Sequence, residues 1–162
     1  MPLLVLTIGD FTVTRSCDEG AALAQSLDHI FKNYRRMTFA QLKSAYQQLL
    51  AEFLAEEQTL LLEAKRRVAE RILMTAIVKQ MPVRTCMRHF GEVQRLGFTD
   101  MVQECSYRII LCRHLVANDA KRQAARMLTE LRRKCDAIKG PRRKELADVK
   151  KPIDDILKQC EA

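Results

Sequence analysis

The sequence is poor in the residues that interrupt regular secondary structure, because its 162 residues include only 5 glycines and 4 prolines. It lacks tryptophan altogether, and aromatic residues make up 6% of the chain. Leucine, alanine, glutamate, lysine, arginine and glutamine are plentiful instead, and these residues lose little or no side-chain freedom in a helix. The composition therefore predicts a mainly α-helical protein.

Long hydrophobic runs are missing too, since no apolar stretch approaches the ~20 residues that a membrane-spanning helix needs. The apolar segment 1–8 has no basic residues before it and no small-residue cleavage pattern after it, which argues against a secretory signal. Hydrophobic residues reach 48% and charged residues 30%, a balance that excludes a disordered chain. We expect a soluble, cytoplasmic protein that folds as a single helical domain over residues 1–162.

The cysteines show no tight spacing, and a chain of this length can fold without disulfides. We therefore expect reduced thiols. Several cysteines fall on the apolar faces of predicted helices, where a free thiol behaves as a small hydrophobic group. The six are Cys17, Cys86, Cys105, Cys112, Cys135 and Cys160.

The segment 1–15 predicts a short β-hairpin. Two runs rich in β-branched and apolar residues lie on either side of Gly9 and Asp10, a pair that suits a two-residue turn. Such a turn places Ile8 opposite Phe11. Because a two-stranded ribbon is marginally stable alone, it is expected to pack on a helix or to pair with another sheet edge, such as that of a second copy.

After the hairpin, apolar residues recur at the three- and four-residue spacing of amphipathic helices. Capping boxes at Ser16–Glu19 and Thr38–Gln41 start the first two helices. The second helix is predicted to be long, because its apolar rhythm continues over residues 38–81, with a shift of frame and a kink near Glu57.

Glycine and proline divide the rest of the chain. Gly97 is suited to end a helix that starts after Pro82, and the nearly all-apolar run 107–116 predicts a central, heavily buried helix. Pro152 is expected to kink or split the last helix. The predicted fold is an antiparallel bundle of five to six helices, with the main helical bundle over 17–139 and a basic C-terminal helix over 141–162.

Four cysteine and histidine side chains form a candidate zinc or redox site. Cys86 and His89 lie one turn apart on one predicted helix, and Cys105 and Cys112 lie on the next. Zinc ligands usually come in tight pairs from loops, however, whereas buried free cysteines are commonly core side chains. The simpler interpretation is that the thiols fill the core, that His89 and the nearby His114 are surface or boundary residues, and that the protein holds no metal and no cofactor.

Arg108 lies between two of these cysteines on the same helix face. It could lower the pKa of a neighbouring thiol into a redox-sensitive range. The simpler expectation is that its charged end reaches out of the core to solvent. The sequence has no Gly-rich phosphate loop, no G-x-S-x-G and no H-E-x-x-H, so no catalytic residue is predicted.

The excess positive charge is concentrated in residues 121–151, which hold 12 lysines and arginines against 4 acidic residues. A surface of this kind can follow a phosphate backbone or meet an acidic lipid or protein, although a solvated helix face is the simpler alternative. No aromatic residue follows Tyr107, so stacking on bases is not expected. The candidate surface consists of Lys121, Arg122, Arg126, Arg132, Arg133, Lys134, Arg142, Arg143 and Lys144.

The leading functional hypothesis is a non-enzymatic interaction protein, an adaptor or regulatory subunit that self-associates or binds a partner helix. The long helix 38–81 and the free edge of the hairpin support it. The alternative is a nucleic-acid-binding protein that uses the basic surface 121–151. A second alternative is a small zinc or redox protein that uses the cysteine and histidine cluster.

Overall fold

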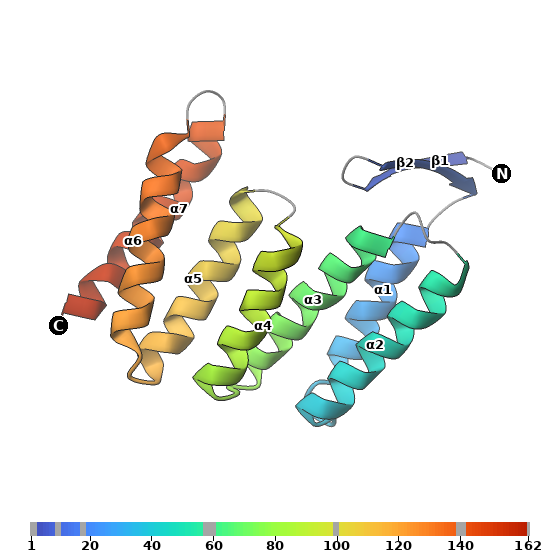
Figure 1. Cartoon of the computed structure of the whole chain (residues 1–162), viewed down its shortest axis with the longest axis horizontal. Helices are drawn as coiled ribbons and strands as arrows, with labels where there is room; N and C mark the ends of the chain where they lie inside the picture. The colour runs from blue at the N-terminus through green and yellow to red at the C-terminus, as the bar shows by residue number, and fades with distance from the viewer. Residues whose placement is uncertain are drawn as a thin grey trace. The chain divides into compact units, whose positions relative to one another are not determined.

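The computed structural model describes residues 3–8, 11–16, 19–56, 61–98, 101–138 and 142–161, which form two strands and seven helices (Figure 1). The mainly helical class is therefore confirmed, but the prediction of five to six helices is wrong by at least one. The elements are β1 (Leu3–Ile8), β2 (Phe11–Ser16), α1 (Glu19–Lys32), α2 (Phe39–Glu56), α3 (Leu61–Val78), α4 (Val83–Leu96), α5 (Met101–Ala117), α6 (Lys121–Ala137) and α7 (Arg142–Glu161).

The chain divides into two compact units. Unit 1 comprises residues 1–79 and 88–97, and unit 2 comprises residues 80–87 and 98–162. Helix α4 contributes its first residues to unit 2 and the remainder to unit 1. The two units are described separately below.

Strands β1 and β2 of unit 1 pair antiparallel, with Ile8 opposite Phe11 and Leu6 opposite Val13. This is the register that a two-residue connection at positions 9 and 10 requires. Those two positions lie outside the described residues, as do residues 17 and 18 of the first predicted capping box. The sheet has two strands in the described part of the chain, so each of them has one edge without a neighbouring strand.

The continuous helix predicted over residues 38–81 is wrong, because α2 ends at Glu56 and α3 begins at Leu61. The two helices pack against each other, and the Tyr46 hydroxyl lies 3.0 Å from Oγ1 of Thr75. In one straight helix, residues 29 positions apart would be about 43 Å apart. The shift of apolar frame near Glu57 marks a chain reversal, which lets α2 and α3 bury their apolar faces on each other.

The second predicted capping box is confirmed at the start of α2. The Thr38 hydroxyl accepts the backbone N–H of Gln41 at 3.2 Å, and the Gln41 side chain accepts the backbone N–H of Thr38 at 2.9 Å. Gly97 ends α4 as expected, with a left-handed φ of 89°. There the Leu96 carbonyl accepts a hydrogen bond of 2.9 Å from Nε of Arg66. Helix α3 thus satisfies a carbonyl that the end of α4 leaves open.

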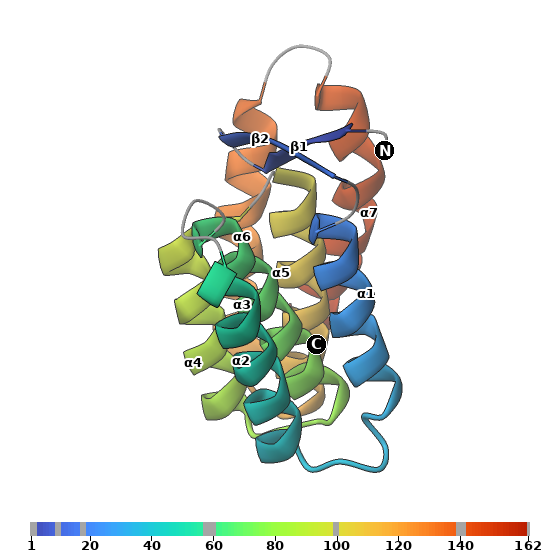
Figure 2. The same ribbon diagram turned by 90° about the vertical axis from the view of Figure 1, so that its right-hand side faces the viewer.

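Unit 2 consists chiefly of α5, α6 and α7, which pack pairwise and lie side by side in both views (Figures 1 and 2). Helix α7 runs unbroken through Pro152, so the expected split is wrong. The predicted apolar stripes of α6 and α7 supply much of the core, which includes Ala124, Leu128, Leu131, Cys135, Leu146, Ile153 and Ile156.

The buried Tyr46–Thr75 contact gives a test of the α2–α3 pairing. The Thr75 hydroxyl donates to the Arg71 carbonyl at 2.8 Å, so the Tyr46 hydroxyl is the donor to Thr75. We expect Thr75→Val to lower the free energy of unfolding by about 2 kcal/mol, because it leaves the buried Tyr46 hydroxyl without a partner. Tyr46→Phe should cost only about 1 kcal/mol. Urea unfolding of both variants measures the difference, and equal costs would contradict the assigned donor.

Candidate functional site

Helix α6 separates apolar and charged side chains onto opposite faces. Its buried residues are Ala124, Met127, Leu128, Leu131 and Cys135. Helices α5 and α7 both pack against α6, and they cover this apolar face. At about 100° per residue, the face opposite the buried one centres on positions 122, 126, 129 and 133.

Three arginines occupy that outer face. Arg122, Arg126 and Arg133 are all exposed, and they fall within an arc of about 40° around the helix axis. The rise of an α-helix spreads them over about 16 Å. None of the three makes an ion pair with any residue that the structure describes. We call these three residues the arginine stripe.

Two other basic residues of the predicted surface are held by acids instead. Arg132 donates from Nη1 to Asp154 of α7 at 2.9 Å and pairs with Asp136 at 3.5 Å. Nζ of Lys134 lies 3.3 Å from Glu104 of α5. The Arg132–Asp136 pair has the i,i+4 spacing of a helix pair, whereas the other two contacts have no sequence signature, because Asp154 and Glu104 are 22 and 30 residues from their partners. These two cations join helices within unit 2.

The remaining members of the predicted surface contribute less to this face. Lys121 is half-buried and has an interaction of its own. Lys144 is exposed near the start of α7. The backbone of Arg142 and Arg143 belongs to α7, but their side chains lie outside the described part of the structure. The structure therefore brings together three of the nine predicted residues as an unpaired set.

Arg108 of α5 is buried, with 2% of its side chain exposed, so the expectation that it reaches solvent is wrong. Its Nε and Nη2 donate to the same oxygen of Glu104, at 3.1 and 3.0 Å. That oxygen also accepts from Lys134. The half-buried Glu104 carboxylate, whose side chain is 13% exposed, stabilises the Arg108 charge inside the core, so the arginine does not have to reach solvent.

The candidate zinc or redox side chains have separate neighbours. Sγ of Cys86 lies 3.6 Å from the Met81 carbonyl, whereas Sγ of Cys112 lies 3.8 Å from the Ala124 carbonyl. Burial raises the pKa of the Cys86 thiol to about 11 and that of the Cys112 thiol to about 12. Arg108 lowers the pKa of Cys112, but this effect is smaller than that of burial. The alternative that Arg108 brings a neighbouring thiol into a redox-sensitive pKa range is therefore not supported for Cys112.

Both histidines near this cluster are buried, which corrects their expected place at the boundary of the core. His114 of unit 2 lies with Nε2 2.8 Å from the Met81 carbonyl. His89 of unit 1 packs edge-on against Phe39, and its Nε2 has no hydrogen-bond partner among the described residues. The described part of the chain contains no group of three or more histidine, cysteine, aspartate or glutamate side chains that could hold a metal ion.

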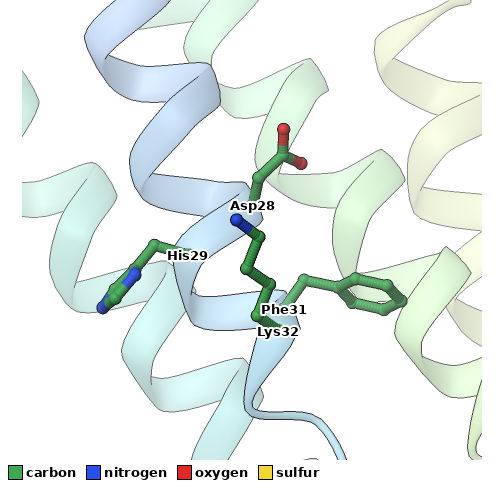
Figure 3. A pocket seen from close by; sticks show the side chains of 4 residues that line it. All are labelled: Asp28, His29, Phe31 and Lys32. Atoms are coloured by element: carbon green, nitrogen blue, oxygen red, sulfur yellow. The ribbon is translucent and has the colours of Figure 1, made fainter.

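A hollow beside α1 is lined by Asp28, His29, Phe31 and Lys32 (Figure 3). Its side chains do not converge, since His29 and Phe31 leave the helix on opposite sides. Asp28 pairs with Arg71 of α3, and the Arg71 guanidinium lies over the Phe31 ring, 5.2 Å from its centroid. These contacts join α1 to α3, and they leave the arginine stripe as the stronger candidate site.

The chain matches no described protein family, and no curated protein or solved structure is significantly similar to it. Among the described helices, none combines the length and the apolar character that crossing a bilayer requires.

The contact between Glu104 and its two cationic partners can be tested by comparing the loss of stability in two variants. We expect Glu104→Ala to lower the free energy of unfolding by about 3 kcal/mol, because it leaves the Arg108 charge buried beside an empty position. Lys134→Ala removes the exposed partner of the same carboxylate and should cost less than about 1 kcal/mol. Denaturant unfolding, monitored by circular dichroism, measures both costs. If Glu104→Ala lowered the free energy of unfolding as little as Lys134→Ala does, the structural role of Glu104 would be contradicted.

His89 should make unit 1 less stable in acid. Burial, followed by the charges of Lys43 and Arg88, lowers its pKa in the folded protein below the usual value. The unfolded chain therefore binds a proton first as the pH falls below about 6.5, and stability is lost from there downward. We expect His89→Phe to reduce this dependence by up to about 1.4 kcal/mol per pH unit between pH 6.5 and 5. His29→Ala, at an exposed histidine, is the matched control and should leave the profile unchanged.

Proposed function

We propose that the protein is a non-enzymatic interaction protein whose partner is a nucleic acid, held through its phosphate backbone by the arginine stripe of α6. The observation that supports this proposal is the selective pairing of charges on one helix. Arg132 and Lys134 form ion pairs with acidic residues of neighbouring helices. The three residues of the arginine stripe are exposed and have no such partners in the described structure.

The spacing of the stripe suits a polyanion. An extended arginine can rotate its guanidinium between neighbouring phosphates, and three such side chains spread over about 16 Å match several phosphates along one strand of a duplex. The guanidinium fork also binds phosphate oxygens in pairs. Unit 2 as a whole supports the contact, with 16 lysines and arginines against 10 acidic residues, compared with 12 against 10 in unit 1.

The surroundings of the stripe favour a nucleic-acid backbone over a lipid surface. A helix that lies on a membrane exposes apolar side chains beside its basic ones. In α6 the apolar residues Met127, Leu128 and Leu131 are buried in unit 2. Since no aromatic residue follows Tyr107, recognition by base stacking is not part of the proposal, and binding should be independent of sequence.

The test is fluorescence anisotropy with a random-sequence DNA duplex, titrated at several salt concentrations. We expect the triple variant Arg122→Gln, Arg126→Gln, Arg133→Gln to bind roughly tenfold more weakly per arginine at low salt, since each phosphate contact releases counterions. The slope of log K against log salt should also become less steep by about 2.7.

The matched control removes the same amount of charge from other exposed positions of unit 2. Arg113→Gln, Lys151→Gln and Lys158→Gln together should retain most of the affinity and the salt slope. Equal losses in the two triple variants would reduce the effect to net charge and overturn the proposal. Binding to anionic phospholipid vesicles without binding to the duplex would overturn it in favour of a membrane surface.

Self-association through the hairpin is a second candidate, favoured by the edges of β1 and β2. Each strand presents one row of backbone groups without a neighbouring strand in the described part of the chain. A strand of a second copy can pair with such an edge. Light scattering on the same samples would detect this association as a dimer. The other expected support, an over-long second helix, is removed by the reversal between α2 and α3.

A further inference from the structure

Two thiols face each other across the contact between α5 and α6. Sγ of Cys105 lies 3.6 Å from Sγ of Cys135, and both residues are buried. The residues that precede them are also in contact, because Glu104 and Lys134 form an ion pair at 3.3 Å. Two successive residues of α5 therefore contact two successive residues of α6, and these contacts set how the two helices are aligned at this point.

The two sulfur atoms are in direct non-bonded contact. A disulfide needs about 2.05 Å between its sulfur atoms, so the thiols must approach by about 1.5 Å. Small changes in the two side-chain torsions, with a slight shift of one helix, supply a movement of this size. No other pair of thiols among the described residues is this close to each other.

We propose that Cys105 and Cys135 are a redox modification site that forms a reversible disulfide in the presence of a peroxide. One sulfur, as thiolate, attacks a peroxide oxygen; the S–O bond forms, the O–O bond breaks, and water leaves after protonation. The second thiolate attacks the resulting sulfenic acid; the S–S bond forms, the S–O bond breaks, and a second water leaves. Two thiols are oxidised by two electrons in total, and one hydrogen peroxide is reduced to two waters.

Burial of the two thiols determines how an oxidant reaches them. Burial and the neighbouring Cys135 thiol raise the pKa of Cys105, and only Arg108 opposes them. Thiolate is therefore scarce while the helices are closed. Oxidation proceeds through local opening of α5 from α6, and a small oxidant such as peroxide reaches the sulfur atoms more easily than a bulky disulfide does. Once formed, the bond joins two helices across 30 residues and stabilises unit 2.

The experiment treats the full-length protein with hydrogen peroxide and then blocks the remaining thiols with an alkylating reagent in denaturant. Trypsin, which cuts after lysine and arginine, separates all six cysteines into different peptides. We expect the intact protein to lose the mass of two hydrogen atoms. The peptide that contains Cys105 should be linked to the one that contains Cys135, and a reducing agent should release the link.

Two kinds of control keep this result specific. Sγ of Cys112 lies 3.5 Å from the sulfur of Met127, which cannot form a disulfide. The Cys112 thiol should therefore stay reduced, and its peptide should appear in the alkylated form in the same digest. Cys105→Ala should abolish the linked peptide, whereas Cys86→Ala should retain it. The oxidised protein should also unfold several degrees above the reduced one. Thiols that all remain alkylatable after peroxide treatment, or a link that joins other cysteines instead, would overturn the proposal.

Discussion

The half-buried carboxylate of Glu104 is the group on which the arrangement of unit 2 depends. It accepts hydrogen bonds from Arg108 on its own helix and lies within 3.3 Å of Lys134 on α6. This carboxylate is the anionic partner that stabilises the charge of Arg108, whose side chain is 2% exposed, inside the core. The ion pair thus allows α5 to be buried on nearly all sides while it still carries a charged residue.

The same contact determines which face of α6 points outward. Lys134 and Arg132 are directed to acids on α5 and α7, and the apolar residues of α6 lie between those two helices. The orientation of α6 about its axis is fixed by these contacts, which leaves Arg122, Arg126 and Arg133 on the exposed side. The exposed arginine stripe and the pair of facing thiols are consequently two results of one helix pairing.

The chain reversal between α2 and α3 shows where a local reading of the sequence is insufficient. The apolar rhythm of residues 38–81 is compatible with one long helix, and also with two helices that bury the same residues on each other. Tyr46 and Thr75 belong to one buried cluster only in the second arrangement. The burial of apolar surface from both helices favours the reversal, and that gain arises from contacts far apart in the sequence.

The sequence by itself determined the helical class, several helix ends and the apolar face of each helix, as Thr38 with Gln41, Gly97 and the buried stripe of α6 illustrate. These features depend on residues within one or two turns of each other, so local spacing is sufficient to predict them. Only the tertiary structure decided that Arg108 and His89 are buried, that Arg132 is paired with Asp154, and that Cys105 faces Cys135. The physical reason is that burial, ion pairing and thiol contact depend on partners from other helices, whose proximity leaves no pattern in the neighbouring sequence.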